Sequence, residues 1–174
     1  LFIWLDYTSI PQSNSHLKAM AIGSLALYAS SVAAFVVIAP SCVHNDSGDQ
    51  CNAETYQKRG WCRLEQWARL SKGEMETLYI YDGETSHMGS ALVPIHRLLM
   101  KDKWLGDAVD VMGGDFTHDD RHLLVDSIVG LWSIALEARH KHADKPDHFV
   151  HRIYKMVNER KQHIFPPKYF KNNI

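Results

Sequence analysis

The chain has 174 residues, of which 45% are hydrophobic and 22% are charged, and its formal net charge is −1. This composition is typical of a globular domain with its own core, and it gives no electrostatic basis for binding nucleic acid or an anionic membrane. The longest apolar run, residues 32–40, is too short to span a bilayer. We therefore expect a single domain over residues 1–174, with neither nucleic acid nor a membrane among its partners.

The three cysteines and the first residue bear on where the protein works. An odd, low number of cysteines argues against a disulfide framework and fits a reducing compartment, so we expect a cytoplasmic protein. The chain begins with Leu1 and opens directly on an apolar run, without a leader. We interpret it as a fragment, truncated at the N-terminus, whose sheet lacks its opening strand.

Three apolar segments in the first half predict β-strands, at residues 1–6, 32–39 and 76–81. They are continuous rather than alternating, which favours strands covered on both faces of a parallel sheet. Helical periodicity over residues 16–30 and 59–70 places one helix between each pair of strands. This order predicts right-handed crossovers and a three-layer, mostly parallel α/β sheet. The predicted apolar face of the first helix comprises Leu17, Met20, Ala21, Ser24, Leu27 and Tyr28.

The second half has a different pattern. Apolar spacing predicts helices over residues 118–141 and 148–162, whereas residues 107–112 suit a short strand or an extended segment. The C-terminal end has no regular pattern, and we expect an irregular tail there. We therefore divide the domain into an α/β core, residues 1–83, and a mainly helical C-terminal extension, residues 84–174.

A polar loop over residues 40–58 contains Cys42, His44 and Cys51, which we considered as zinc ligands. Their spacing lacks both a fourth ligand and the paired cysteines of a zinc knuckle, so we predict no metal site. Four further histidines surround a predicted helix break, and we interpret them as solvent-exposed: His140, His142, His148 and His151.

The helix predicted over residues 59–70 carries the residue best suited to chemistry. Glu65 follows Trp61 by one helical turn, so it lies at the edge of the apolar stripe of this helix. A carboxyl group beside a buried face needs a partner, or its pKa rises. Two interpretations remain open: a catalytic carboxylate in a cleft beside Trp61, or a structural ion pair with Arg69 one turn further along.

Two more side chains allow both a functional and a structural interpretation. Asp6 ends a predicted strand, where open α/β sheets place their ligands, and it is equally suited to a turn that follows the strand. Cys62 could serve as a nucleophile, although a cysteine on a helix is more often a small buried apolar residue.

Three blocks together resemble the heterokaryon-incompatibility (HET) domain: IWLDYTSIPQ, a helix ending in SLALYASS, and the strand AFVVIAP. Trp4, Asp6 and Gln12 match its first motif, and RGWCRLEQ is similar to a later one, with the acid and amide in a different order. The latter block also resembles the W-C-x-x-E helix of TIR domains, through Trp61, Cys62 and Glu65. The resemblance covers about the first 81 residues and implies a flavodoxin/TIR-like fold.

The resemblance implies an NAD glycohydrolase, a hydrolase that cleaves the nicotinamide–ribose bond in an immune or incompatibility-type response. Glu65 would then be the catalytic residue, and NAD would be a substrate, so no cofactor is expected. The alternative is a non-catalytic signalling module that associates with copies of itself, and the sequence leaves both functions open. The residues that the resemblance places around the nucleotide are Asp6, Tyr7, Ser9, Gln12 and Trp61.

Overall fold

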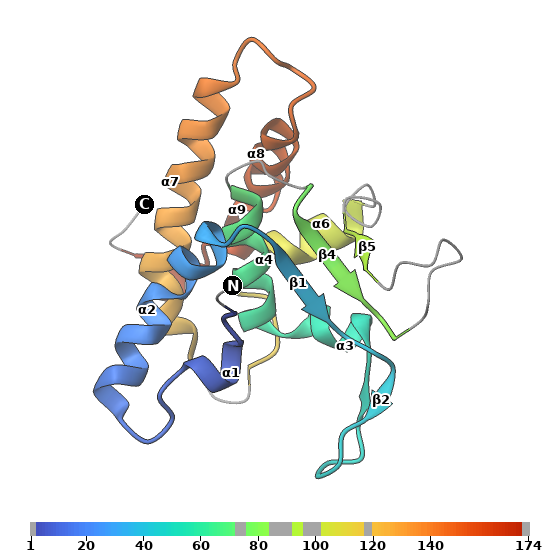
Figure 1. Ribbon diagram of the computed structural model, residues 1–174. Coiled ribbons are helices and arrows are strands. Elements are labelled where there is room, and N and C mark those ends of the chain that lie inside the picture. The colour runs from blue at the N-terminus through green and yellow to red at the C-terminus, as the bar shows by residue number, and fades with distance from the viewer. Residues whose placement is uncertain (1–2, 72–75, 84–91, 96–101, 117–119, 172–174) are drawn as a thin grey trace.

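The structure is a computed structural model that describes residues 3–71, 76–83, 92–95, 102–116 and 120–171. Of these residues, 59% lie in helices and 11% in strands, and the strands form two small sheets (Figure 1). The prediction of a three-layer, mostly parallel, flavodoxin/TIR-like sheet is therefore wrong. Helices supply most of the packing around a small sheet at one side of the molecule.

The larger sheet has the strand order β1-β4-β5. Strand β1 (Phe35–Ile38) runs parallel to β4 (Leu78–Tyr81), with Phe35 opposite Leu78, and β5 (Val93–Pro94) is antiparallel to β4. The two strands predicted around these segments, and their parallel pairing, are confirmed. They are shorter than predicted, and Val37 is the buried residue of β1, so helices cover this strand less completely than expected.

The strand predicted over residues 1–6 is wrong. The described part of this segment is extended up to Leu5 without strand pairing, and helix α1 (Asp6–Ser9) begins at Asp6. Ile3 is 73% exposed, and the Trp4 ring lies against that of Tyr28 at 6.0 Å between centroids. The apolar run is therefore anchored by a side-chain contact instead of by a ladder of backbone hydrogen bonds.

Helix α2 (Ser15–Ser31) confirms the first predicted helix. Its N-cap is Asn14, whose side chain accepts a hydrogen bond from the Leu17 backbone N–H at 3.0 Å, and neither of the neighbouring serines serves as the cap. The predicted apolar face is not the buried one. The residues of α2 that are buried are Ile22, Leu25, Ala29 and Ser30.

Helix α4 (Gly60–Ser71) lies at the centre of the fold, packed against α2, α6 (Asp102–Val109) and α7 (Val125–Lys141) (Figure 1). It confirms the helix predicted over residues 59–70, but every residue from Cys62 to Ser71 is buried, so burial extends well beyond the predicted apolar stripe. It continues directly from α3 (Ala53–Lys58), which Asn52 and Thr55 begin with a reciprocal capping box.

The polar side chains of α4 are buried with partners from other segments. The Arg63 guanidinium donates to the carbonyl oxygens of Gln57 and Asp110, at 2.7 and 2.8 Å. The Gln66 amide donates to the Gln57 side-chain oxygen at 2.7 Å. Such charge-assisted and neutral hydrogen bonds offset the cost of removing these groups from water.

The C-terminal half packs directly onto the central helix. Trp132 of α7 stacks on Tyr154 of α8 (Phe149–Glu159), with ring centroids 5.5 Å apart. The helices predicted over residues 118–141 and 148–162 are confirmed in their described parts, with a 3₁₀ turn, Asp120–Leu124, before α7. One hydrophobic core cluster extends from Leu25 to Phe170.

Two predictions for the second half are wrong. The segment 107–112 is the end of α6 and the turn that follows it, not a strand. The C-terminal tail contains helices α9 (Lys161–Ile164) and α10 (Pro167–Phe170), and Phe170 is buried against Phe165. Within the described ranges, no helix combines the length and the apolar character that crossing a membrane requires.

Candidate functional site

A pocket of about 300 Å³ brings the carboxyl groups of Asp6 and Glu65 together. We call it the acid pocket. Residues 34–38, which include strand β1, form one wall, and residues from the segment before α1 and from helices α1 to α4 form the others. Its chemistry-bearing and aromatic lining residues are Trp4, Asp6, Tyr28, Phe35, Tyr56, Arg59, Cys62 and Glu65.

Glu65 is the most deeply buried acid of the pocket, with 5% of its surface exposed. Its pKa is raised to about 8, chiefly by burial, with the negative charge of Asp6 and a hydrogen bond to Asp6 acting in the same direction and the positive charge of Arg59 opposing them. At neutral pH the Glu65 carboxyl is therefore mostly protonated, and its O–H donates to Asp6.

Asp6 is the member of the pair that ionises first. Burial raises its pKa as well, but the positive charge of Arg59 and the hydrogen bond from Glu65 both lower it. Two carboxyl groups in contact rarely ionise together, because the second charge would be placed beside the first in a poorly solvated site. The pair thus shares one proton and carries one negative charge near neutral pH.

One oxygen of Glu65 has few partners. Apart from the neighbouring Asp6 carboxyl, Oε1 is buried without a hydrogen-bond partner in the described part of the chain. The expected structural ion pair with Arg69 is not formed: the Arg69 guanidinium donates to the backbone oxygen of Val32, at 2.9 Å, and to the Thr77 hydroxyl. A buried carboxyl oxygen without a partner costs free energy, and it marks a position where a ligand can bind.

Arg59 lies on the rim of the acid pocket, and its backbone is held by a distant loop. The backbone N–H of Gly60 donates to the Asp115 oxygen at 2.9 Å, and that of Asp115 donates to the Lys58 oxygen at 2.7 Å. Arg59 and Asp115 thereby form an isolated β-bridge. The position of Arg59, a cation that acts on both carboxyl groups, thus depends on the loop before Phe116.

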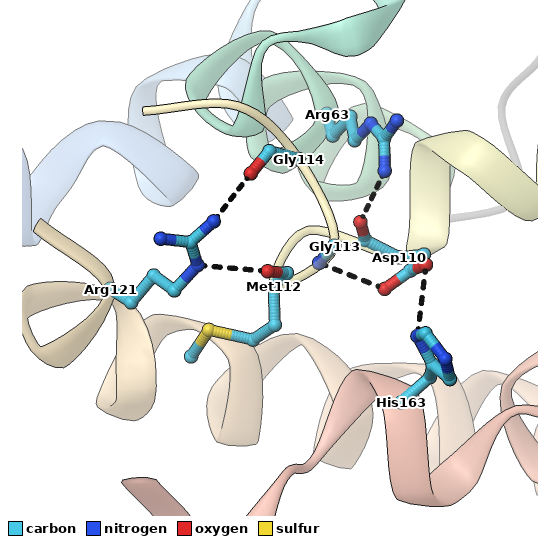
Figure 2. A network of polar contacts seen from close by, with 7 residues as sticks. All are labelled: Arg63, Asp110, Met112, Gly113, Gly114, Arg121 and His163. Atoms are coloured by element: carbon cyan, nitrogen blue, oxygen red, sulfur yellow. Dashed lines mark hydrogen bonds and ion pairs between the residues drawn. The ribbon is translucent and has the colours of Figure 1, made fainter. Parts of the chain in front are cut away.

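Figure 2 shows how that loop is fixed between helices. Arg121 donates to the backbone oxygens of Met112 and Gly114, at 2.9 and 2.8 Å, while Arg63 of α4 binds the Asp110 oxygen. A Cβ atom on Gly114 would lie 2.5 Å from the Gly60 Cα, so the loop approaches α4 too closely for any side chain there.

Tyr56 and Cys62 complete the polar lining, and neither is an activated nucleophile. Burial raises the pKa of the Cys62 thiol to about 12, an effect that nearby Glu65 and Asp6 strengthen and Arg59 opposes. Burial also raises the pKa of the Tyr56 hydroxyl well above its ordinary value, and this hydroxyl is hydrogen-bonded to Cys62. The structural interpretation of Cys62, a buried thiol, therefore fits its surroundings.

The other residues that the sequence placed near a nucleotide lie elsewhere. Trp61 packs edge-on against Phe116, at 6.1 Å between centroids, and is not among the described lining residues. The Ser9 hydroxyl accepts from the Leu5 N–H at 3.1 Å, and the Gln12 amide donates to the Ile10 oxygen at 3.0 Å. Tyr7 lies on α1, and its side chain is outside the described residues.

Sequence reasoning missed Arg59 and Tyr56. Arg59 had a detectable signal, because it immediately precedes the Gly-Trp-Cys block that led to Glu65. Tyr56 had none, since it comes from a segment predicted to be loop and reaches the pocket through helix α3.

The described residues contain no group of three or more histidine, cysteine, aspartate or glutamate side chains arranged to hold a metal ion. Nδ1 of His44 instead accepts from the backbone N–H groups of Asp46 and Ser47, both at 3.3 Å. The rings of His142 and His148 stack at 3.8 Å between centroids.

The chain matches no protein-family model, no curated protein and no solved structure.

Proposed function

We propose that the acid pocket binds NAD or a related nucleotide at its nicotinamide riboside end and cleaves the nicotinamide–ribose bond. The HET- and TIR-like motifs suggest the substrate. The observation that carries the proposal is Glu65: a buried carboxyl whose Oε1, among the described residues, has no hydrogen-bond partner other than Asp6, the second carboxyl of the pocket. Catalytic groups often have such perturbed pKa values.

The charge of the pair suits this reaction. Cleavage of the bond from ribose to nicotinamide passes through an oxocarbenium-like transition state, which carries positive charge on the sugar. An ionised carboxylate in a poorly solvated pocket stabilises such a charge more strongly than it would in water. The nicotinamide ring of NAD is itself cationic, so the substrate also favours ionised carboxyl groups.

Binding of NAD should therefore change the protonation of the pair formed by Asp6 and Glu65. A cation beside Glu65 lowers the pKa of that carboxyl and favours loss of its proton, leaving two carboxylates around the ribose. The C–N bond then breaks, and its electron pair leaves with nicotinamide, which becomes neutral. Water adds to the ribose carbon, and its proton passes to a carboxylate and then to solvent. The products are nicotinamide, ADP-ribose and a proton.

The shape and lining of the pocket agree with a flat ring and a sugar. Trp4 and Tyr28 supply aromatic surface at one side, and a volume of about 300 Å³ suits the nicotinamide riboside half of the molecule. Arg59 also borders a second, wider depression of about 780 Å³, which contains Lys58 and the hairpin after β1. In this proposal, Lys58 and Arg59 bind the phosphates of the nucleotide.

The experiment incubates the full chain with NAD and follows nicotinamide release, with Glu65→Gln and the control Glu54→Gln, which changes an exposed glutamate on α3. We expect release by the wild type and by Glu54→Gln, and a loss of at least ~100-fold in Glu65→Gln. Release that persists in Glu65→Gln would remove Glu65 from the site. No release by any of the three proteins would contradict the enzyme proposal.

A second function, self-association, is favoured by one specific observation on α2. The face predicted to be buried is exposed: Leu27 is 64% exposed, Met20 58%, and Leu17 and Tyr28 are exposed as well. Helix α2 is therefore apolar on two faces, one in the core and one on the surface. Large exposed apolar side chains on one helix face are typical of protein interfaces, and we propose a second copy of this chain as the partner.

A further inference from the structure

The hairpin between β1 and α3 aligns two of the three cysteines. Strands β2 (Cys42–Val43) and β3 (Gln50–Cys51) pair antiparallel, with Cys42 directly opposite Cys51. Residues directly opposite each other in an antiparallel pair project to the same face, and their Cα atoms lie about 4.5 or 5.5 Å apart. Both spacings fall inside the range of about 4.4–6.8 Å that a disulfide bond accepts.

The turn of the hairpin keeps this register. The His44 N–H donates to the Asp49 oxygen at 2.8 Å, and the Gly48 N–H donates to the His44 oxygen at 2.9 Å. Gly48 has a φ of 74°, which a glycine adopts without strain. Because a slip in register would break these bonds, the two cysteines stay opposite each other.

Both thiols are free and within reach of small molecules. Cys42 is exposed and Cys51 is half-buried, whereas Cys62 is buried in the acid pocket. The Cys51 thiol makes only a weak contact with the Asp49 oxygen, at 3.9 Å, along its own strand. Little therefore holds it away from Cys42.

We propose that Cys42 and Cys51 are a modification site that forms a reversible intramolecular disulfide by exchange with a small disulfide such as oxidised glutathione. One cysteine thiolate attacks a glutathione sulfur, forms a mixed disulfide and releases one glutathione. The second thiolate attacks the protein-bound sulfur and releases the other glutathione. The two cysteines together lose two protons and two electrons, and the small disulfide becomes two thiols.

A disulfide bond between Cys42 and Cys51 would restrict the hairpin that lies next to the acid pocket. The hairpin lines the wide depression that also contains Tyr56 and Arg59, and each of its strands is only two residues long. A covalent link between the strands restricts opening of this hairpin. The inference does not depend on the proposed reaction, because thiol exchange needs only the two cysteines and the small disulfide.

The test equilibrates the reduced full chain with mixtures of reduced and oxidised glutathione, quenches with acid, alkylates free thiols and maps peptides by mass spectrometry. In the wild type we expect Cys42 and Cys51 to lose alkylation together and to appear as one linked peptide pair, while Cys62 stays free. Cys42→Ser and Cys51→Ser should each carry a glutathione adduct on the remaining cysteine. The control, Cys62→Ala, should behave as the wild type.

Three outcomes would overturn the proposal: two glutathione adducts on the wild type, a linked pair that includes Cys62, or no oxidation in oxidised glutathione alone. Peptide mapping of the wild type keeps the test valid if Cys62→Ala fails to fold. Hydrogen exchange provides a second readout. Amides of residues 42–51 should exchange more slowly after oxidation, and unchanged exchange would contradict the claim that the bond restricts the hairpin.

Discussion

The carboxyl group of Glu65, on the central helix α4, is hydrogen-bonded to the carboxyl group of Asp6, at the start of α1. This contact joins the N-terminal segment to the core and makes the two acids one titrating unit. Apart from Asp6, Oε1 of Glu65 has no hydrogen-bond partner in the described structure. The acid pocket therefore combines a shared proton, a cation at its rim in Arg59 and aromatic walls.

The free energy of unfolding should decrease as the pH rises between the pKa of Glu65 in the unfolded chain and its higher pKa in the folded protein. Its pKa is about 8 in the folded protein, against an ordinary value of 4.5. Below the lower value both states are protonated; between the two values the unfolded chain ionises first, so folding becomes less favourable, by up to ~1.4 kcal/mol per pH unit. Urea unfolding at several pH values should show this slope in the wild type and lose it in Glu65→Gln. If the free energy of unfolding depended on pH in the same way in both proteins, the pKa of Glu65 would not be raised in the folded state.

Removing the positive charge of Arg59 should raise the pKa of both acids, since this residue lowers each of them. In Arg59→Gln, the fall in stability should therefore extend to higher pH than in the wild type. The matched control is Lys58→Gln, a neighbouring exposed cation that does not act on the pair. An equal effect of the two substitutions would mean that general surface charge, and not Arg59, sets the pKa values.

Gly114→Ala should destabilise the protein by about 1–3 kcal/mol, because the added Cβ would lie 2.5 Å from the Gly60 Cα and the backbone would have to move. Gly130→Ala is the control, since a Cβ there meets nothing within 4 Å and lies within helix α7. It should stabilise by up to about 1 kcal/mol. The free energy of unfolding in urea measures both, and a neutral Gly114→Ala would disprove the close approach.

The exposed face of α2 should control self-association without contributing to the core. Leu27→Ser should abolish concentration-dependent growth in light scattering and leave the free energy of unfolding of the monomer almost unchanged, because Leu27 is 64% exposed. Leu25→Ala, at a position 1% exposed, should instead cost about 2–5 kcal/mol. A wild type that stays monomeric at all concentrations would exclude self-association through this face.

The segments that sequence predicted correctly are those in which the local pattern specifies the structure. Helix α2 covers the predicted range, although Asn14 caps it and neither neighbouring serine does, and the β-branched run of β1 pairs with β4 as expected. The β-strand predicted over residues 1–6 is wrong because an apolar run does not specify what it packs against. Trp4 packs on Tyr28, and Ile3 remains exposed. A strand prediction needs a neighbouring edge as well as composition.

The helix predicted over residues 59–70 is confirmed as α4, but its central position was not predicted. Its apolar stripe accounts for one buried face, yet Arg63 and Gln66 are buried as well. Their partners, Gln57 and Asp110, come from α3 and from the loop after α6. Sequence spacing does not reveal such long-range hydrogen bonds, so the helix could not be recognised as central.

For the site, the sequence singled out Asp6 and Glu65, and the structure places these two residues in one pocket. It could not show that they share a proton, because that depends on burial and on their mutual contact. Trp61 was placed on the same side as Glu65 from helical spacing, but the ring turns to Phe116, whose position depends on the loop that Arg121 holds.

The most direct test of the account is a titration of the Glu65 carboxyl by carbon NMR in the full chain, with its resonance assigned through Glu65→Gln. The account predicts a pKa of about 8 in the free protein. When NAD is added, the cationic ring should lower this pKa, with release of a proton near neutral pH. An ordinary glutamate pKa, or a raised pKa that NAD does not change, would contradict it.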